Sequence, residues 1–129
     1  MMKKVVIVDD DESIRKTFFL ILHSDYRVYL ARDAEEALRR FSGADIDLII
    51  ADLKLPHLDG LEMIKRFRKA GYKGEVILIS AFPGLLDSET LSRLDVGRIF
   101  VKPLELEALT QSIASLLASE NGQRKGLEA

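Results

Sequence analysis

Five short apolar runs constrain the fold of this chain more than any other feature of its sequence. Each run is continuous and does not alternate with polar residues, which is typical of strands covered on both faces of a sheet. The runs are Lys4–Val8, Tyr26–Leu30, Asp47–Ala51, Glu75–Ser80 and Arg98–Val101. We therefore expect five buried strands.

Segments with helical spacing alternate with these runs one for one. Asp11 or Ser13 can cap the first helix and Asp33 the second, while Gly43 and Gly71 follow the ends of the second and third. The segments span residues 13–24, 33–43, 58–71, 85–97 and 104–118. This alternation predicts an α/β fold in which helices cover both faces of a doubly wound parallel sheet.

Length and composition limit the classes of function. The chain has 129 residues, which predicts one domain over residues 1–118, and the polar end, 119–129, is expected to be a disordered tail or the start of a linker. A net charge of −2 with both signs mixed predicts no direct nucleic-acid binding. The apolar runs are too short for membrane insertion. The absence of cysteine excludes disulfides and thiol chemistry, and weakly favours the cytoplasm.

Polar side chains follow the expected strands where a ligand site would form. The carboxyl ends of parallel strands meet at one edge of a sheet, and these strands deliver there Asp9–Asp11, Asp52, Ser80 and Lys102. Clustered carboxylates repel one another unless a cation offsets them, and oxygen ligands without His or Cys suit Mg²⁺ or Mn²⁺. A metal, a lysine and a hydroxyl around one aspartate suit phosphoryl transfer, with the aspartate as nucleophile.

Four motifs in order, VVIVDDDE, DLIIADLKLPHLDG, ILISA and VKP, give the chain a family resemblance. From Lys3 to about Leu117 it resembles the receiver domain of two-component response regulators, the CheY-like superfamily. The resemblance implies a flavodoxin-like (βα)5 sheet with strand order 2-1-3-4-5. It also implies a cytoplasmic phosphorelay switch that takes a phosphoryl group from a histidine kinase or histidine phosphotransfer protein and acts on an unidentified downstream protein. Such a protein catalyses its own phosphorylation and slow dephosphorylation and does not turn over small substrates.

The same resemblance implies a role for each matching residue around the metal. Asp52 matches the phosphoacceptor, which is also a metal ligand. Asp10 matches the direct ligand of Mg²⁺ or Mn²⁺, and Asp9 matches an acid that acts through metal-bound water. The backbone carbonyl of Lys54 matches the remaining protein ligand.

Further matches concern the phosphoryl group and the backbone around it. Ser80 matches the hydroxyl that follows the phosphoryl group, and Lys102 matches the lysine that pairs with its oxygens. Pro103 matches a proline that commonly follows a cis bond in this family. Pro56 and Gly60 match the turn into the third helix.

One position departs from the family pattern, and two others suggest kinetics. Ile99 stands where the family usually has an aromatic switch residue, and Phe100 should point to the other face of the strand. Either the coupled motion of the hydroxyl and the aromatic side chain is lost, or Ile99 still responds to the phosphorylation state through its packing, with a smaller effect. Lys54 and Phe82 should overhang the site, and the bulk of Phe82 predicts slow self-dephosphorylation.

Several alternatives remain open at this point. The run Asp9–Asp11 also suits a simple helix N-cap. Ile14 is either part of a core stripe or a docking contact for a kinase or phosphotransfer helix pair. The departure at Ile99 fits a receiver-fold interaction module that phosphate does not switch. A phosphatase with an aspartyl nucleophile usually carries a second acid where this chain has Lys54.

Overall fold

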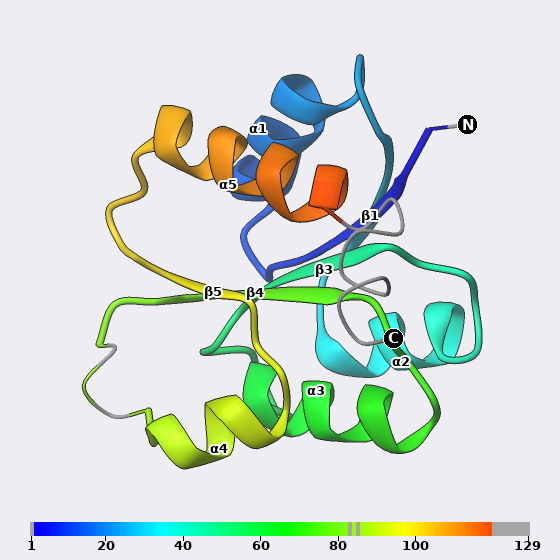
Figure 1. Ribbon diagram of the computed structural model, residues 1–129, viewed down its shortest axis with the longest axis vertical. Coiled ribbons are helices and arrows are strands. Elements are labelled where there is room, and N and C mark those ends of the chain that lie inside the picture. The colour runs from blue at the N-terminus through cyan, green and yellow to red at the C-terminus, as the bar shows by residue number, and fades with distance from the viewer. Residues whose placement is uncertain (1, 83, 85, 120–129) are drawn as a thin grey trace.

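A five-stranded parallel sheet lies at the centre of the computed structural model, which describes residues 2–82, 84 and 86–119 (Figure 1). The strands are β1 (Lys4–Val8), β2 (Arg27–Ala31), β3 (Leu48–Asp52), β4 (Glu75–Ser80) and β5 (Arg98–Val101). The helices are α1 (Glu12–Leu22), α2 (Ala34–Phe41), α3 (Gly60–Lys69), α4 (Ser88–Arg93) and α5 (Leu106–Ser119). The strand order β2-β1-β3-β4-β5 confirms the expected doubly wound, flavodoxin-like topology.

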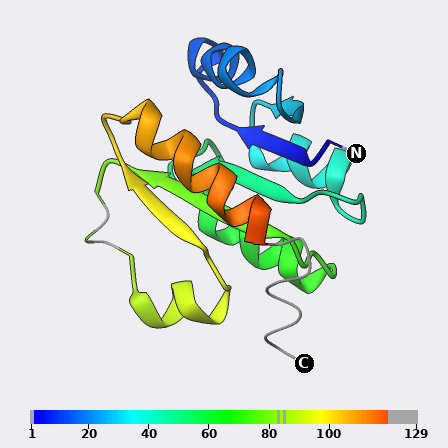
Figure 2. The same cartoon turned by 45° about the horizontal axis from the view of Figure 1, so that its top comes forward.

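Helices cover both faces of this sheet. α1 and α5 lie on one face, and α2, α3 and α4 lie on the other (Figures 1 and 2). Because successive strand residues point to opposite faces, Val5 and Ile7 belong to the core under α1 and α5, while Val6 and Val8 belong to the core under α2 and α3. Each such buried side chain contributes about 1.5–3 kcal/mol, so the central strands form a firm frame.

Two strands are displaced by one residue from their predicted bounds. Tyr26 does not begin β2, because its backbone N–H donates to the carbonyl of Leu22 at 2.9 Å and completes the turn after α1. β3 extends to include Asp52, which pairs with Ile79 of β4. Asp52 is therefore held within the ladder of the sheet and does not simply follow the strand.

Side-chain caps determine where several helices begin and end. Asp11 and Asp33 accept hydrogen bonds from backbone N–H groups in the first turns of α1 and α2, as predicted. α4 is shorter than the predicted segment 85–97, because Asp87 caps its start and Asp95 adopts a positive φ of 56° beyond its end. No residue of this short helix is buried.

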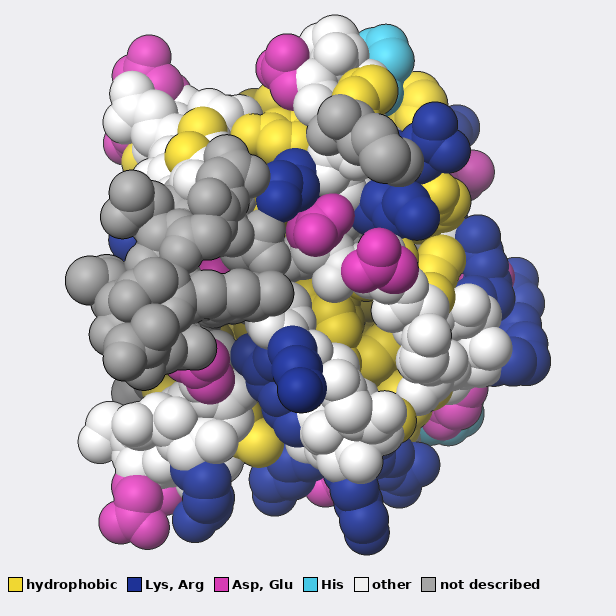
Figure 3. All heavy atoms as spheres, turned by 45° about the vertical axis from the view of Figure 1, so that its right-hand side comes forward, with side chains coloured by type: hydrophobic (Ala, Val, Ile, Leu, Met, Phe, Trp, Pro, Cys, Tyr) yellow, Lys and Arg dark blue, Asp and Glu magenta, His cyan; other side chains and the backbone are white. Residues whose placement is uncertain are grey.

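Charge is distributed unevenly along α2 and α3. Acidic residues occupy the first turn of each helix and basic residues the last, namely Arg39, Arg40, Arg66, Arg68 and Lys69. Figure 3 shows Lys and Arg side chains gathered along the right-hand and lower parts of the face drawn there. Acidic N-termini and basic C-termini complement the helix dipoles, so helix stability accounts for this arrangement.

The predicted tail, residues 119–129, lies outside the described residues except for the backbone of Ser119, which ends α5. Over the residues that the structure describes, no helix combines the length and apolar character needed to cross a membrane.

Candidate functional site

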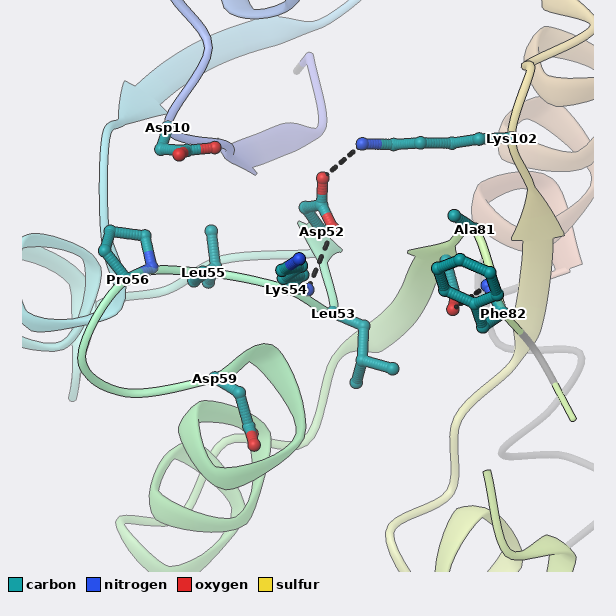
Figure 4. Close-up of a pocket in the computed structure, with 11 residues that line it drawn as sticks. Asp10, Asp52, Leu53, Lys54, Leu55, Pro56, Asp59, Ala81, Phe82 and Lys102 are labelled. Atoms are coloured by element: carbon teal, nitrogen blue, oxygen red, sulfur yellow. Dashed lines mark hydrogen bonds and ion pairs between the residues drawn. The ribbon is translucent and has the colours of Figure 1, made fainter. Parts of the chain in front are cut away.

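A cavity of about 690 Å³ opens at the carboxyl ends of the central strands (Figure 4). Its walls come from the connections that follow β1, β3, β4 and β5, which the parallel topology brings to one edge of the sheet. The predicted site residues among its walls are Asp10, Asp52, Lys54, Pro56, Ser80, Phe82 and Lys102. The fold thus brings together side chains that are far apart in the sequence.

Asp52 is the buried carboxylate of this cavity, with 5% of its surface exposed. Its Oδ2 lies 2.5 Å from Nζ of Lys102, and its Oδ1 accepts a hydrogen bond from the backbone N–H of Lys54 at 2.9 Å (Figure 4). A buried carboxylate is costly unless a cation and hydrogen bonds compensate it. Both compensations are present, and they fix the direction of the carboxylate at the wall of the cavity.

Lys102 is held as a cation by the acids around it. Its partial burial alone would lower the pKa of Lys102, but the hydrogen bond and negative charge of Asp52, with smaller contributions from Asp9 and Asp10, raise that pKa overall. A lysine that stays charged beside Asp52 can pair with further negative oxygens in the cavity.

Asp9 and Asp10 add more negative charge than Lys102 can offset. Burial raises the pKa of Asp9 from 3.8 to about 6. The charges of Asp52 and Asp10 add to this effect, while a hydrogen bond from the backbone N–H of Asp11 opposes it. Asp10 is exposed, and in Figure 4 its carboxyl group is directed toward the side of the cavity where Asp52 lies. These carboxylates repel one another.

A hard divalent cation fits this donor set. The carboxylates of Asp10 and Asp52 line one cavity, and every donor they offer is an oxygen. Within residues 2–82, 84 and 86–119, no three side chains of His, Cys, Asp or Glu are arranged to hold a metal by themselves. Mg²⁺ does not need such a cage, because it commonly uses one or two carboxylates, keeps several waters and shares phosphate oxygens.

The β4 side of the cavity carries a hydroxyl and an aromatic ring. Ser80 is buried, and its Oγ accepts a hydrogen bond from the backbone N–H of Phe82 at 2.9 Å. The side chain of Phe82 is 67% exposed, although Phe82 lines the cavity. Phe82 therefore lies at the solvent-facing side of the cavity.

The last strand separates the two candidate switch residues. Ile99 packs with the core under α2, α3 and α4, and Phe100 packs with the core under α1 and α5. The two side chains thus lie on opposite faces of the sheet, as predicted from their adjacent positions. The peptide bond between Lys102 and Pro103 is cis, as the resemblance implied.

Gly60 has a more specific reason to be glycine than the expected turn. A Cβ at this position would lie 2.5 Å from the carbonyl oxygen of Asp52, and the N–H of Gly60 donates to the carbonyl of Leu53 at 2.8 Å. α3 therefore begins in direct contact with the end of β3. A glycine shortly after a strand-end aspartate is the sequence signal for this close approach.

Two residues near the site were not singled out from the sequence. Asp59 lines the cavity, but its carboxylate caps α3 by accepting from the N–H of Glu62 at 2.8 Å. Arg15 donates from Nη1 to the carbonyl oxygen of Asp9 at 2.7 Å. In the sequence, the one signal for the contact between Arg15 and Asp9 is that Arg15 lies four residues after the helix cap Asp11. Ile14 is partly buried against the core under α1 and α5, which favours the core-stripe interpretation.

Comparisons with known proteins agree on one family. Residues 5–114 match the family described as the response regulator receiver domain. The chain is 36% identical over 127 residues to the probable transcriptional regulator ycf27 of Cyanidium caldarium, a match that covers 94% of this chain and 50% of that protein. It is 30% identical over 118 residues to the alkaline phosphatase synthesis transcriptional regulatory protein PhoP of Bacillus subtilis, covering 91% of this chain and 49% of that protein.

Solved structures share the fold over nearly the whole chain. A CheY-like receiver domain protein of Methanospirillum hungatei JF-1 superposes with a TM-score of 0.87 at 25% identity, covering 95% of this chain and 99% of that one. The response regulator TrrA of Thermotoga maritima, in complex with Mg(2+)-BeF, gives 0.79 at 28% identity, covering 90% and 100%. The chain spans about half the length of the curated relatives named above.

Proposed function

The chain belongs to the response regulator receiver family, and from this premise we propose that Asp52 accepts a phosphoryl group from the phosphohistidine of a histidine kinase or histidine phosphotransfer protein. The observation that carries the proposal is the buried Asp52 carboxylate, held by Lys102 and the N–H of Lys54, in a cavity that Asp10 also lines. The TrrA complex with Mg(2+)-BeF shows that a relative holds this cation. We propose Mg²⁺, or Mn²⁺, as the cofactor here.

The transfer needs a positioned nucleophile and a compensated charge. An oxygen of the Asp52 carboxylate attacks the phosphorus, the bond from phosphorus to the histidine nitrogen breaks, and the imidazole leaves with its electron pair. Lys102 pairs with a phosphoryl oxygen as its contact with Asp52 loosens, and the N–H of Lys54 keeps the carboxylate in line. A bound divalent cation supplies further positive charge, with Asp10, Asp52 and the carbonyl of Lys54 as its protein ligands and Asp9 acting through water.

The acyl phosphate would act on the β4–β5 side of the domain. Oγ of Ser80 accepts from the N–H of Phe82, and its hydroxyl would donate to an oxygen of the phosphoryl group, which draws Ser80 toward Asp52 and changes the packing of α4. Ile99 packs under this helix in place of an aromatic residue. We therefore propose that Ile99 responds to phosphorylation through its packing, with a smaller effect on α4 than an aromatic side chain would have. Phe100 lies on the other face and takes no part in this motion.

Partner recognition would lie next to the cavity. Receiver domains of this family interact with histidine kinases, and Ile14 on α1 is partly exposed, shortly after the aspartates that follow β1. We propose that it contributes to docking as well as to the core. Cytoplasmic location and an unidentified downstream protein are part of the same proposal, and direct nucleic-acid binding is not expected of this domain.

Phosphorylation by a small donor tests the proposal directly. The protein is incubated with Mg²⁺ and acetyl phosphate or phosphoramidate, and intact mass is measured with time. We expect one phosphoryl adduct in the parent protein and in Asp59→Asn, a matched control that keeps the helix cap, and none in Asp52→Asn.

The other outcomes identify the alternatives. No adduct in the parent protein, with Mg²⁺ and donor in excess, would contradict the proposal and favour an interaction module that phosphate does not switch. Rapid turnover of a phosphomonoester without an adduct would favour the phosphatase alternative.

A further inference from the structure

The side chain of Arg15 holds the backbone immediately before Asp10. Its guanidinium Nη1 donates to the carbonyl of Asp9 at 2.7 Å, whereas its backbone N–H makes only the ordinary first bond of α1, to the carbonyl of Asp11 at 3.1 Å. Arg15 is partly buried in the first turns of α1 and does not line the cavity. The proposed phosphoryl transfer gives this side chain no role.

Two more hydrogen bonds in the connection between β1 and α1 hold Asp9 and Asp11, the neighbours of Asp10. The N–H of Asp9 donates to the carbonyl of Ala31 at 3.1 Å, and the N–H of Asp11 donates to Oδ1 of Asp9 at 2.9 Å. The bond from Arg15 to the Asp9 carbonyl and the bond from the Asp11 N–H together fix the two peptide planes next to Asp10. Since the Cα–Cβ direction follows from those planes, the exposed carboxylate of Asp10 is aimed by contacts that its own side chain does not make.

We infer that Arg15 is a positioning residue for divalent-cation binding, which aims the Asp10 carboxylate by holding the carbonyl of Asp9 with its guanidinium. The inference rests on the proposed function, because it assumes that Asp10 is a ligand of Mg²⁺. It assigns the role to the hydrogen bond of the Arg15 guanidinium and not to its charge.

The charge of Arg15 alone would act in the opposite direction. A fixed cation within the β1–α1 connection repels an incoming divalent ion, so a purely electrostatic role predicts tighter Mg²⁺ binding when the charge is removed. A positioning role predicts weaker binding. Lysine at this position keeps the charge and one donor on a flexible stem, but it loses the planar guanidinium that can reach the Asp9 carbonyl in a fixed geometry.

The test compares Arg15→Gln, Arg15→Lys and the control Arg66→Gln in the full chain. Arg66 is an exposed arginine of α3 whose side chain contacts Glu62 at 3.4 Å, away from the cavity. Mg²⁺ affinity is measured by titration calorimetry without phosphodonor, and thermal unfolding is measured with chelator. We expect Arg15→Gln to weaken Mg²⁺ binding about tenfold, the lower end for residues that orient metal ligands. Arg15→Lys should restore part of the loss, and Arg66→Gln should bind as the parent does.

Phosphorylation kinetics give a second readout. At saturating Mg²⁺, the rate with acetyl phosphate should return close to the parent rate in Arg15→Gln, because Asp52 and Lys102 are untouched; only the Mg²⁺ concentration for half-maximal rate should rise. A lower rate at saturation with an unchanged Mg²⁺ requirement would overturn the inference.

Other outcomes overturn it as well. A positioning role is contradicted if Arg15→Gln binds Mg²⁺ as tightly as the parent or more tightly. It is also contradicted if both Arg15 variants bind Mg²⁺ more weakly only to the extent that they lose folded protein. If Arg15→Gln does not fold, Arg15→Lys decides, since it must weaken Mg²⁺ binding at an unchanged unfolding midpoint. Failure of the parent protein to bind Mg²⁺ would instead refute the cofactor in the proposed function.

Discussion

The two sides of the cavity are built differently. On the side of β1 and β3, Asp9 and Asp52 are 2% and 5% exposed and each has a fixed hydrogen-bond partner. On the side that follows β4, Phe82 is 67% exposed and α4 has no buried residue. Asp9 and Asp52 are thus set in the rigid core, whereas Phe82 and α4 lie where the fold can move at little cost.

α4 is nevertheless anchored at one end. The guanidinium of Arg68 on α3 donates to the carbonyls of Leu94 and Asp95, at 2.9 and 3.0 Å, just beyond the last turn of α4. The same group donates to the carbonyls of Tyr72 and Gly74. In the first turn of α4, which lies nearer to the cavity in sequence, Asp87 caps the helix and Glu89 pairs with Arg93 at 3.8 Å, so these contacts of the described residues stay within α4 and its cap. Motion of α4 should therefore be largest at the end next to the site.

Two glycines, one at the start of α3 and one between β4 and α4, offer the strongest test of this comparison. A Cβ at Gly60 would meet the carbonyl oxygen of Asp52 at 2.5 Å, whereas a Cβ at Gly84 would meet nothing within 4 Å. We expect Gly60→Ala to lower the free energy of unfolding by about 2–3 kcal/mol, because backbone must shift, and Gly84→Ala to change it by no more than about 0.5 kcal/mol. Urea unfolding measures both, and equal losses would show that the two sides are equally rigid.

Protonation of Asp9 tests the charged side. The pKa of Asp9 is about 6 in the folded protein against an ordinary value of 3.8, mainly because of burial. The folded state therefore holds this proton more tightly than the unfolded chain does, so the stability contribution is fully present below about pH 4 and is lost as pH rises through 6. A neutral side chain avoids that loss.

We therefore expect Asp9→Asn, in the presence of chelator, to be more stable than the parent at pH 7.5 and equal to it at pH 4. Asn can still accept from the N–H of Asp11. The full shift corresponds to about 3 kcal/mol, and because water at the cavity mouth screens part of it, about 1–2 kcal/mol should remain. Thermal unfolding at both pH values measures the difference. A gain at pH 4 as large as at pH 7.5 would contradict the assignment.

The sequence predicted most of this arrangement, and what it missed depends on contacts in space. Continuous apolar runs and helix caps suffice for the sheet, because burial and local hydrogen bonds act within a few residues. Asp52 and Lys102 were predicted as site residues because each comes at the carboxyl end of an expected strand. The clamp of Arg15 on Asp9 could not be predicted, because it depends on the angle at which α1 leaves its strand. Gly60 was predicted as a turn residue, but the sequence did not give its close approach to the carbonyl of Asp52. The length of α4 was overestimated, because apolar spacing does not reveal the cap at Asp87.

Phe82 provides the smallest and most specific test, on the open side of the cavity. Its ring is 67% exposed, so Phe82→Ala should leave stability within about 0.5 kcal/mol of the parent. If the ring obstructs the water that attacks the acyl phosphate, its removal should lower that barrier by about 1 kcal/mol and shorten the phosphoryl lifetime about fivefold. The adduct is followed by intact mass after the donor is removed, with Phe19→Ala, an exposed aromatic on α1, as control. An unchanged lifetime in Phe82→Ala would show that this side of the cavity is open to water with or without the ring, and that slow dephosphorylation must come from the charged side.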